Sequence, residues 1–451
     1  MKRAQVELKR EVGVWAATAL VIGEVIAVGI FLTPAGMAKS LGSPLWMLVV
    51  WLLMGLMALS GALCYAELAA RFPQAGGSYV YLRESFGAMT AFLYGWMVLL
   101  VLDPGLTAAL AVGAASYAGY ILNLSPFGIK LFALLSILML ALANILGVRL
   151  GALLMQALTA LKLGLLLLIV LWGFGFRQGS WANFQPFVAQ RAGSEPFVGA
   201  FAGALVLAFF SFAGWWDLSK IAGEVREPAR NMPRALTYGI LVITLSYILT
   251  SAAFLYLVPL ERVTSSETFA AQAGEALFGR TGGQVFASVV VISVWGSLTA
   301  LIMAAPRVYY AMARDGLFFE FAAQLHPRFR TPARAIILQA ALASLLIITG
   351  TFESIISYFF FIVIVFIALT VASVFILRRR ERSAALHTIP GYPLTPLFFL
   401  ALVAVLLVMI AAGNPRQAFL GTAVVALGAP VYHLVFRKQA RRTVDRAPDG
   451  F

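Results

Sequence analysis

The chain has 451 residues, of which 61% are apolar and only 12% are charged. Soluble domains average about 45–50% apolar and about 25% charged residues, so a soluble protein of this size is excluded. The mean hydropathy is +0.91. Because one membrane-spanning helix needs about 20 apolar residues, we expect an all-α polytopic membrane protein. Continuous apolar runs exclude a β-barrel, whose strands alternate between apolar and polar residues.

The net charge of +14 does not indicate a nucleic-acid partner, because the basic residues are distributed by membrane side. Cys64 is the only cysteine and lies in an apolar segment, so we expect no disulfide-linked partner. The three histidines, His326, His387 and His433, fall near span ends or in loops. They form no cluster, so neither a metal site, a cofactor nor a catalytic centre is expected.

Apolar windows of 18 or more residues predict twelve spans. They lie near residues 12–38, 44–70, 87–121, 129–148, 150–175, 197–220, 235–259, 284–313, 335–351, 353–377, 392–412 and 416–436. With twelve spans, most of the 33 Lys and Arg residues, Lys220 and Arg307 among them, fall on the side that holds both termini. The positive-inside rule therefore predicts cytoplasmic termini in a plasma membrane, and the short tails favour a bacterial inner membrane.

Two spans contain residues that weaken a helix in mid-membrane. Residues 23–34 (GEVIAVGIFLTP) include two glycines and a proline, and residues 209–217 (FFSFAGWWD) are interrupted by Ala213 and Gly214. Small residues can simply allow close helix packing. Broken helices can instead form a substrate site, with free N–H groups for an anion and unwound carbonyls for a cation. Such a site suits a zwitterion such as an α-amino acid.

Four stretches carry a resemblance to a known family. They are residues 29–34 (GIFLTP), 66–73 (AELAARFP) with 76–81 (GGSYVY), 224–228 (EVREP) with 230–235 (RNMPRA), and 313–316 (ARDG). The sequence resembles the amino acid–polyamine–organocation superfamily, and within it the L-amino acid transporter-like permeases. The resemblance implies one transporter domain over residues 1–451 with the LeuT-type 5+5 inverted repeat. The repeats would be residues 12–175 and 197–380, with helices 1 and 6 broken, and residues 391–437 would form two additional helices.

The resemblance also implies which residues bind the substrate. Its carboxylate would lie on the N–H groups of Val28, Gly29 and Ile30, where the family commonly has a Gly-Ser-Gly-type triplet and this chain has Ala27-Val28-Gly29. Its ammonium group would meet the carbonyls of Val25, Phe210 and Ala213, and Phe210 would gate the site. The remaining pocket residues would be Ile26, Ala27, Ser211, Phe212, Gly214 and Trp216.

Lys162 is the one basic residue inside a span, about ten residues from either end. A mid-span lysine costs about 3 kcal/mol to insert, unless it reaches an interface. Sodium-independent members of the family carry a lysine here, so the resemblance argues against sodium coupling. A lysine that releases a proton and a permanently charged lysine that favours obligatory exchange are both compatible with the sequence.

Acidic and hydroxyl side chains near these segments complete the candidate site. Glu24 and Asp103 could balance Lys162, relay a proton or attract a cationic substrate, or could be ordinary polar caps; Asp217 lies near the cytoplasmic half, beside Lys220. Ser297 could hydrogen-bond Lys162 or the substrate, or bond back to the i−4 carbonyl. The charged motifs at 224–234 and 314–316 are expected to gate the cytoplasmic mouth.

These patterns together predict a secondary amino acid transporter that works by alternating access and is not an enzyme. We expect sodium-independent exchange of neutral L-amino acids by a monomer or weak homo-oligomer. Proton-coupled transport of cationic amino acids or polyamines is the alternative. A non-transporting receptor or subunit is the alternative from another class.

Overall fold

The computed structural model describes residues 8–27, 29–175, 179–259, 274–275, 277, 279–349, 352–380, 388–413 and 415–437, without the side chains of residues 32, 280 and 352–360. Within these ranges the chain is helical, and the only β pairing is a single bridge between Val12 and Val225.

The helices follow one another with short connections. The first half contains α1 (Val14–Val25), α2 (Gly29–Leu41), α3 (Pro44–Arg71), α4 (Ser78–Phe86), α5 (Ala88–Met97), η1 (Val98–Leu102), α6 (Asp103–Leu122), α7 (Pro126–Ile145), α8 (Val148–Gly175) and η2 (Trp181–Phe184). The second half contains α9 (Phe197–Phe212), η3 (Trp215–Glu224), α10 (Pro228–Leu257), η5 (Gly279–Thr281), α12 (Gly282–Ala304), α13 (Pro306–Arg314), η6 (Glu320–Ala323), α14 (Ala333–Thr349), α15 (Phe352–Arg380), α16 (Leu394–Gly413), α17 (Pro415–Ala426), α18 (Gly428–Val431) and η7 (Tyr432–Phe436).

Ten helical stretches among the described residues are long and apolar enough to cross a membrane. Four of them combine neighbouring helices: α5, η1 and α6 run as Ala88–Leu122, α9 and η3 as Phe197–Glu224, α12 and α13 as Gly282–Arg314, and α17, α18 and η7 as Pro415–Phe436. Two more apolar helices are shorter, namely α1 with 12 residues and α14 with 17. The expected all-α polytopic architecture is therefore confirmed, whereas the count of twelve spans stays a prediction.

Both expected interruptions are present in the described chain. Helix α1 ends at Val25 and α2 begins at Gly29, while α9 ends at Phe212 and the 3₁₀ helix η3 begins at Trp215. Between α9 and η3, Gly214 has a φ of +110°, a conformation that residues with a Cβ rarely adopt. The sequence thus breaks these two helices where glycine permits an irregular backbone.

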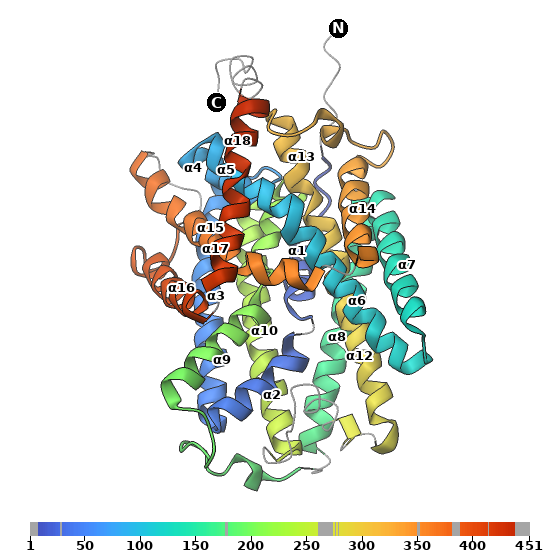
Figure 1. Ribbon diagram of the computed structural model, residues 1–451, viewed down its shortest axis with the longest axis vertical. Helices are drawn as coiled ribbons and strands as arrows, with labels where there is room; N and C mark the ends of the chain where they lie inside the picture. Colours follow the sequence, from blue (N-terminus) through green and yellow to red (C-terminus); the bar gives the residue numbers. More distant parts are fainter. Residues whose placement is uncertain are drawn as a thin grey trace.

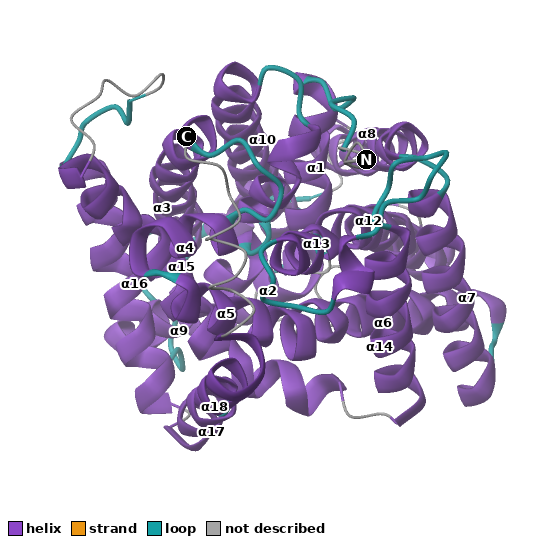
Figure 2. Ribbon diagram, turned by 90° about the horizontal axis from the view of Figure 1, so that it is seen from above, coloured by secondary structure: helices purple, strands orange, loops and turns teal. Residues whose placement is uncertain are grey.

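Glycines let the central helices approach closely. A Cβ added at Gly239 of α10 would lie 2.5 Å from Val21 of α1, and one at Gly61 of α3 would lie 2.7 Å from Trp215. Figures 1 and 2 show α7 and α16 at opposite edges of the bundle, and Figure 1 shows α1 and α10 near the middle of its view. Helices in lipid lack a hydrophobic driving force for association. Small residues allow close approach, so van der Waals contacts stabilise the packing instead.

Ion pairs fasten the end of the bundle that carries α4 and α13, called here the α4–α13 end (Figure 1). The fully buried Arg307 donates to both carboxylate oxygens of Glu224, over 2.6 and 3.1 Å. Glu67 accepts from Arg71 at 3.0 Å, from Arg378, and from the Ile389 N–H. The sequence counts Arg307 on the side of the termini, and the structure adds that its charge is neutralised inside the protein.

We predict that Glu224→Gln destabilises the protein by about 3–5 kcal/mol, since it leaves the Arg307 charge buried without its counter-ion. The half-life of the folded monomer in mild detergent measures this effect. Glu227→Gln is the matched control, because Glu227 and Arg230 form an exposed pair at 3.7 Å. That control should change stability by less than about 0.5 kcal/mol. Equal half-lives for the two variants would contradict the assignment.

Candidate functional site

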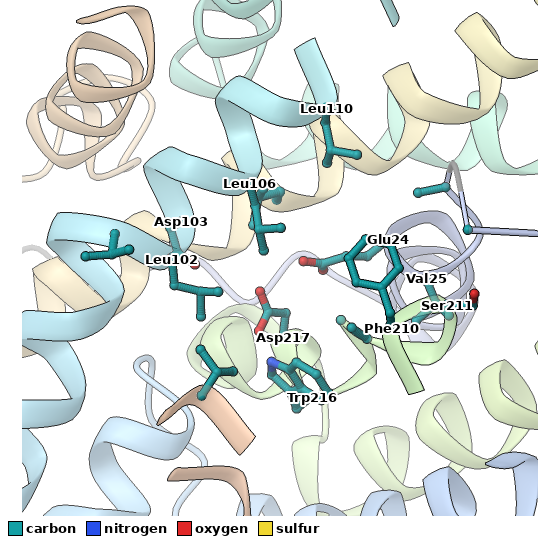
Figure 3. A pocket seen from close by; sticks show the side chains of 17 residues that line it. Glu24, Val25, Leu102, Asp103, Leu106, Leu110, Phe210, Ser211, Trp216 and Asp217 are labelled. Carbon is teal, nitrogen blue, oxygen red and sulfur yellow. The ribbon is translucent and has the colours of Figure 1, made fainter. Parts of the chain in front are cut away.

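A cavity of about 130 Å³ lies where the two broken helices meet α6 (Figure 3). Most of its wall is apolar, and two carboxyl side chains, Glu24 and Asp217, point into the region between α6 and the break in helix 1. Its lining residues are Glu24, Val25, Ala27, Gly29, Val101, Leu102, Asp103, Leu106, Leu110, Phe210, Ser211, Ala213, Gly214, Trp216, Asp217, Leu301 and Val363. The volume is close to that of a cavity of roughly 150 Å³ that holds benzene.

Lys162 of α8 holds the end of α1. Its ammonium group donates to the carbonyl of Gly23 at 2.8 Å, to the carbonyl of Ile26, and to the Ser297 hydroxyl at 3.2 Å. Ser297 of α12 in turn donates to the Gly23 carbonyl at 2.6 Å. The lysine is fully buried and so does not reach an interface. Carbonyl groups that the helix break frees are thus satisfied by a fixed cation and a hydroxyl.

Two glycines make room for this arrangement. A Cβ on Gly296 would lie 3.0 Å from Cε of Lys162, and one on Gly23 would lie 2.6 Å from the hydroxyl of Thr159. Thr159 donates to the carbonyl of Ala19, one turn earlier in α1. Thr159 and Lys162 of α8 therefore donate hydrogen bonds to successive turns at the end of α1.

Hydroxyl groups join the two breaks on the other side. Tyr247 of α10 interacts with the carbonyls of both Val25 and Ser211, at 3.0 and 2.7 Å. The hydroxyls of Thr33 and Ser211 lie 2.9 Å apart and link α2 to α9. These bonds fix the unwound segments relative to one another across the cavity.

A second buried lysine lies beside the cavity. Lys220 of η3 donates to Asp217 at 2.7 Å and to Asp103 at 3.1 Å, and Tyr309 approaches Asp103 at 3.4 Å. The sequence counts Lys220 on the side of the termini, and the structure shows that it is buried and paired inside the protein. Asp103 is paired with Lys220 and not with Lys162, because α6 presents it to η3 rather than to α8.

The position of Asp103 follows from a local irregularity. A π-helical turn, η1, precedes it, and Pro104 begins the α-helix that follows. Proline cannot donate a backbone N–H, which favours such a local rearrangement, and π-turns often occur at functional sites. Leu102, Leu106 and Leu110 then share one face and form the cavity wall on α6.

The structure brings together most of the residues that the sequence singled out. Val25, Ala27, Gly29, Phe210, Ser211, Ala213, Gly214, Trp216, Glu24 and Asp103 line one cavity, and Ser297 and Lys162 lie beside it. Val28 lies outside the described residues.

Three of the expected residues do not line this cavity. The side chains of Ile26 and Ile30 are fully buried in the core. Phe212 packs against Trp51 and Tyr247.

Sequence reasoning missed Tyr247, Thr33, Lys220 and the α6 leucines. A tyrosine inside an apolar span is ordinary core composition, so nothing marked Tyr247. The i, i+4, i+8 spacing of Leu102, Leu106 and Leu110 was a usable signal for one helix face.

At the α4–α13 end a second set of charges closes the surface above this site. Arg83 of α4 pairs with Asp315, and Tyr79 donates to the same carboxylate at 2.8 Å. The pKa of the Tyr79 phenol is raised mainly by burial and further by the neighbouring Asp315 carboxylate. The phenol therefore remains a hydrogen-bond donor at neutral pH. Glu224 and Asp315, both from the motifs expected to gate the mouth, are therefore held in contacts between helices.

Comparison with known proteins now separates the possible functions. A family model described as "Amino acid permease" matches residues 12–435. The chain belongs to this amino acid permease family. It is 30% identical over 437 residues to the serine/threonine exchanger SteT of Bacillus subtilis, covering 96% of this chain and 98% of SteT. It is also 30% identical to the large neutral amino acids transporter small subunit 2 of Homo sapiens, covering 95% and 81% of the two chains.

A third relative, the b(0,+)-type amino acid transporter 1 of Mus musculus, is 30% identical over 82% of this chain and 76% of its own length. The resemblance to the transporter-like permeases is thereby confirmed. The permease family and these relatives are transporters and not enzymes. This permease is accordingly a multi-pass membrane transporter, and its two helix breaks enclose the candidate site.

We predict that Gly214→Ala lowers stability by about 1–3 kcal/mol, because alanine at a φ of +110° is strained and its Cβ would lie 2.9 Å from Glu24 Cγ. Substrate binding should weaken as well, since Glu24 would be displaced. Gly203→Ala is the control: Gly203 lies inside α9 with nothing within 4 Å of an added Cβ, so alanine should stabilise the helix slightly. Thermal unfolding in detergent measures both, and the same sign for both would contradict the prediction.

Proposed function

We propose that this permease exchanges neutral L-amino acids by alternating access without sodium, in a twelve-span arrangement of the LeuT type. Residues 12–175 and 197–380 would be the inverted repeats, and residues 391–437 the additional pair of helices. Support comes from the matching interruptions, one between α1 and α2 and one between α9 and η3. Such folds place the substrate at the breaks, where backbone groups are free to bind it.

The substrate's charged ends would bind backbone groups of the two breaks. Helix α2 begins at Gly29, so the N–H groups of Gly29 and Ile30 have no acceptor within their own helix and suit a carboxylate. The Phe210 carbonyl accepts one bond, from the Ala213 N–H, and a carbonyl has two lone pairs, so it retains capacity for a substrate ammonium group. The Val25 carbonyl accepts from the Ala27 N–H at 2.8 Å and lies 3.0 Å from the Tyr247 hydroxyl. That hydroxyl has one proton and lies 2.7 Å from the Ser211 carbonyl, so donation to Ser211 would free Val25 for the ammonium group.

The side-chain region of the cavity favours neutral substrates of small or medium size. Leu102, Leu106, Leu110 and Val101 form one wall, and the free volume is about 130 Å³. Phe210, whose side chain is 46% exposed, lies at the cavity and would close over the substrate as a gate. The relatives named as serine/threonine and large neutral amino acid transporters are consistent with this size range.

Lys162 carries the proposal of sodium independence. Its ammonium group lies between α1 and α12 and takes the Gly23 and Ile26 carbonyls together with the Ser297 hydroxyl. Carbonyl and hydroxyl oxygens are the ligands that a hard metal cation would use. A permanently charged lysine at this place does the work of a bound cation and needs no ion gradient.

The remaining assignments follow from the same features. Cys64 is buried in α3, so we infer a permease that works without a disulfide-linked partner, as a monomer or weak homo-oligomer.

Both described ends of the chain lie at the α4–α13 end (Figure 1). The positive-inside rule assigns this end to the cytoplasm, and the membrane would be a bacterial inner membrane. Proton-coupled transport of cationic amino acids is a second candidate, favoured by Glu24 and Asp217 at the cavity.

We predict that liposomes containing the protein take up labelled neutral amino acids only when they are preloaded with unlabelled amino acid. Replacing external sodium with choline should leave the rate unchanged. Lys162→Met should reduce exchange to background, because the Gly23 and Ile26 carbonyls lose their shared donor. Lys130→Met, at an exposed position, is the control and should exchange at the wild-type rate.

Sodium-dependent uptake would contradict the role proposed for Lys162. Uptake of lysine, arginine or polyamines with no uptake of neutral amino acids would favour the second candidate.

A further inference from the structure

Two carboxyl groups face one another at the floor of the cavity, and neither has a complete set of donors. Glu24 is the next-to-last residue of α1 and Asp217 lies in the first turn of η3. Figure 3 shows the two carboxyl groups pointing toward each other, and they are close enough to interact. Oε2 of Glu24 and Oδ1 of Asp217 are both buried and accept no hydrogen bond from the described residues.

Asp217 itself is 3% exposed, and its other oxygen accepts from Lys220. Two ionised carboxylates are acceptors only, so they cannot satisfy one another. One proton between them would turn one oxygen into a donor and would satisfy both orphaned positions at once. Neighbouring carboxyl groups in a dry site hold a shared proton for this reason.

The charges around the pair also indicate one bound proton. The charged groups that face the pair are Lys220 from η3, Asp103 from α6 and Lys162 from α8. The neutral phenols of Tyr309, Tyr94 and Tyr65 lie near the same cluster. With both lysines charged, three ionised carboxylates leave one uncompensated negative charge. One proton makes the buried cluster neutral, which removes the cost of an unpaired charge in a low-dielectric interior.

We propose that Glu24 and Asp217 share one proton whenever the α4–α13 end is closed, and that this proton is the latch between the two broken helices. Release of the proton to water breaks one carboxyl O–H bond and leaves two carboxylates. Their repulsion separates the end of α1 from η3 and opens the cavity toward the α4–α13 end. The role of the latch in exchange and the positive charge counted for Lys162 rest on the proposed function. The facing carboxyl groups and their two orphaned oxygens do not.

Infrared difference spectroscopy of the purified protein tests the proton site directly. A protonated buried carboxyl group gives a C=O stretch that an ionised one lacks, and this band should be present at neutral pH. Glu24→Gln and Asp217→Asn should each lose the band, whereas Glu24→Asp should retain it. Glu67→Gln is the matched control and should keep the band, because Glu67 already accepts from two arginines and one N–H.

Exchange in liposomes tests the latch. Wild-type exchange should slow as the pH is raised, since the deprotonated pair cannot close. Whatever exchange remains in Glu24→Gln should no longer depend on pH over the same range, whereas Glu24→Asp should still depend on it.

No band in the wild type, or an unchanged pH profile in Glu24→Gln, would overturn the proposal. Stimulation by sodium or potassium at constant pH would also overturn it, by assigning the pair to a metal ion. A band that Glu24→Gln removes, in a protein that exchanges no amino acid, would support the proton site while the proposed function fails.

Discussion

The structure depends on one requirement, namely that every backbone group freed inside the membrane must find a partner. An interrupted helix leaves its last carbonyls and the first N–H groups of the next segment unbonded, and lipid offers no water to replace those bonds. In this permease the freed carbonyls of α1 are bound by Lys162, Ser297 and Tyr247. In the proposed function, the amide groups at the start of α2 would bind the substrate carboxylate.

Charge is arranged under the same constraint. Lys162, Lys220 and Arg307 are all fully buried, and each is surrounded by acceptors from at least one other helix. Removing a single partner from such a group leaves a charge in a medium that solvates it poorly. The buried charges therefore connect helices that lie far apart in the sequence.

Much of this organisation could be predicted from the sequence. The apolar runs predicted the helices, and Gly23, Gly29 and Gly214 marked the two breaks because glycine is the residue that permits such backbone. The family resemblance added the order of the helices around the site, which spacing alone does not contain. Lys162 was recognisable because a charge at mid-span is costly enough to require a purpose.

The rest depends on contacts between distant helices. Lys220 looked like one more basic residue at the end of a span, and only the packing of η3 against α6 shows that it lies between Asp103 and Asp217. The pairing of Arg307 was missed for the same reason, since its partner Glu224 lies 83 residues earlier in the chain. A hydropathy profile locates charged residues along the sequence but contains no information on which residues they contact.

In the proposed function, the two breaks, held open by Lys162 and Tyr247, bind the charged ends of an amino acid. The decisive measurement is a structure of the purified protein with a bound neutral amino acid, prepared without sodium. We predict the substrate carboxylate at the N–H groups of Gly29 and Ile30, its ammonium group at the Val25 and Phe210 carbonyls, and its side chain against the α6 leucines. Substrate bound away from the breaks, or a sodium ion where the Lys162 ammonium group lies, would contradict it.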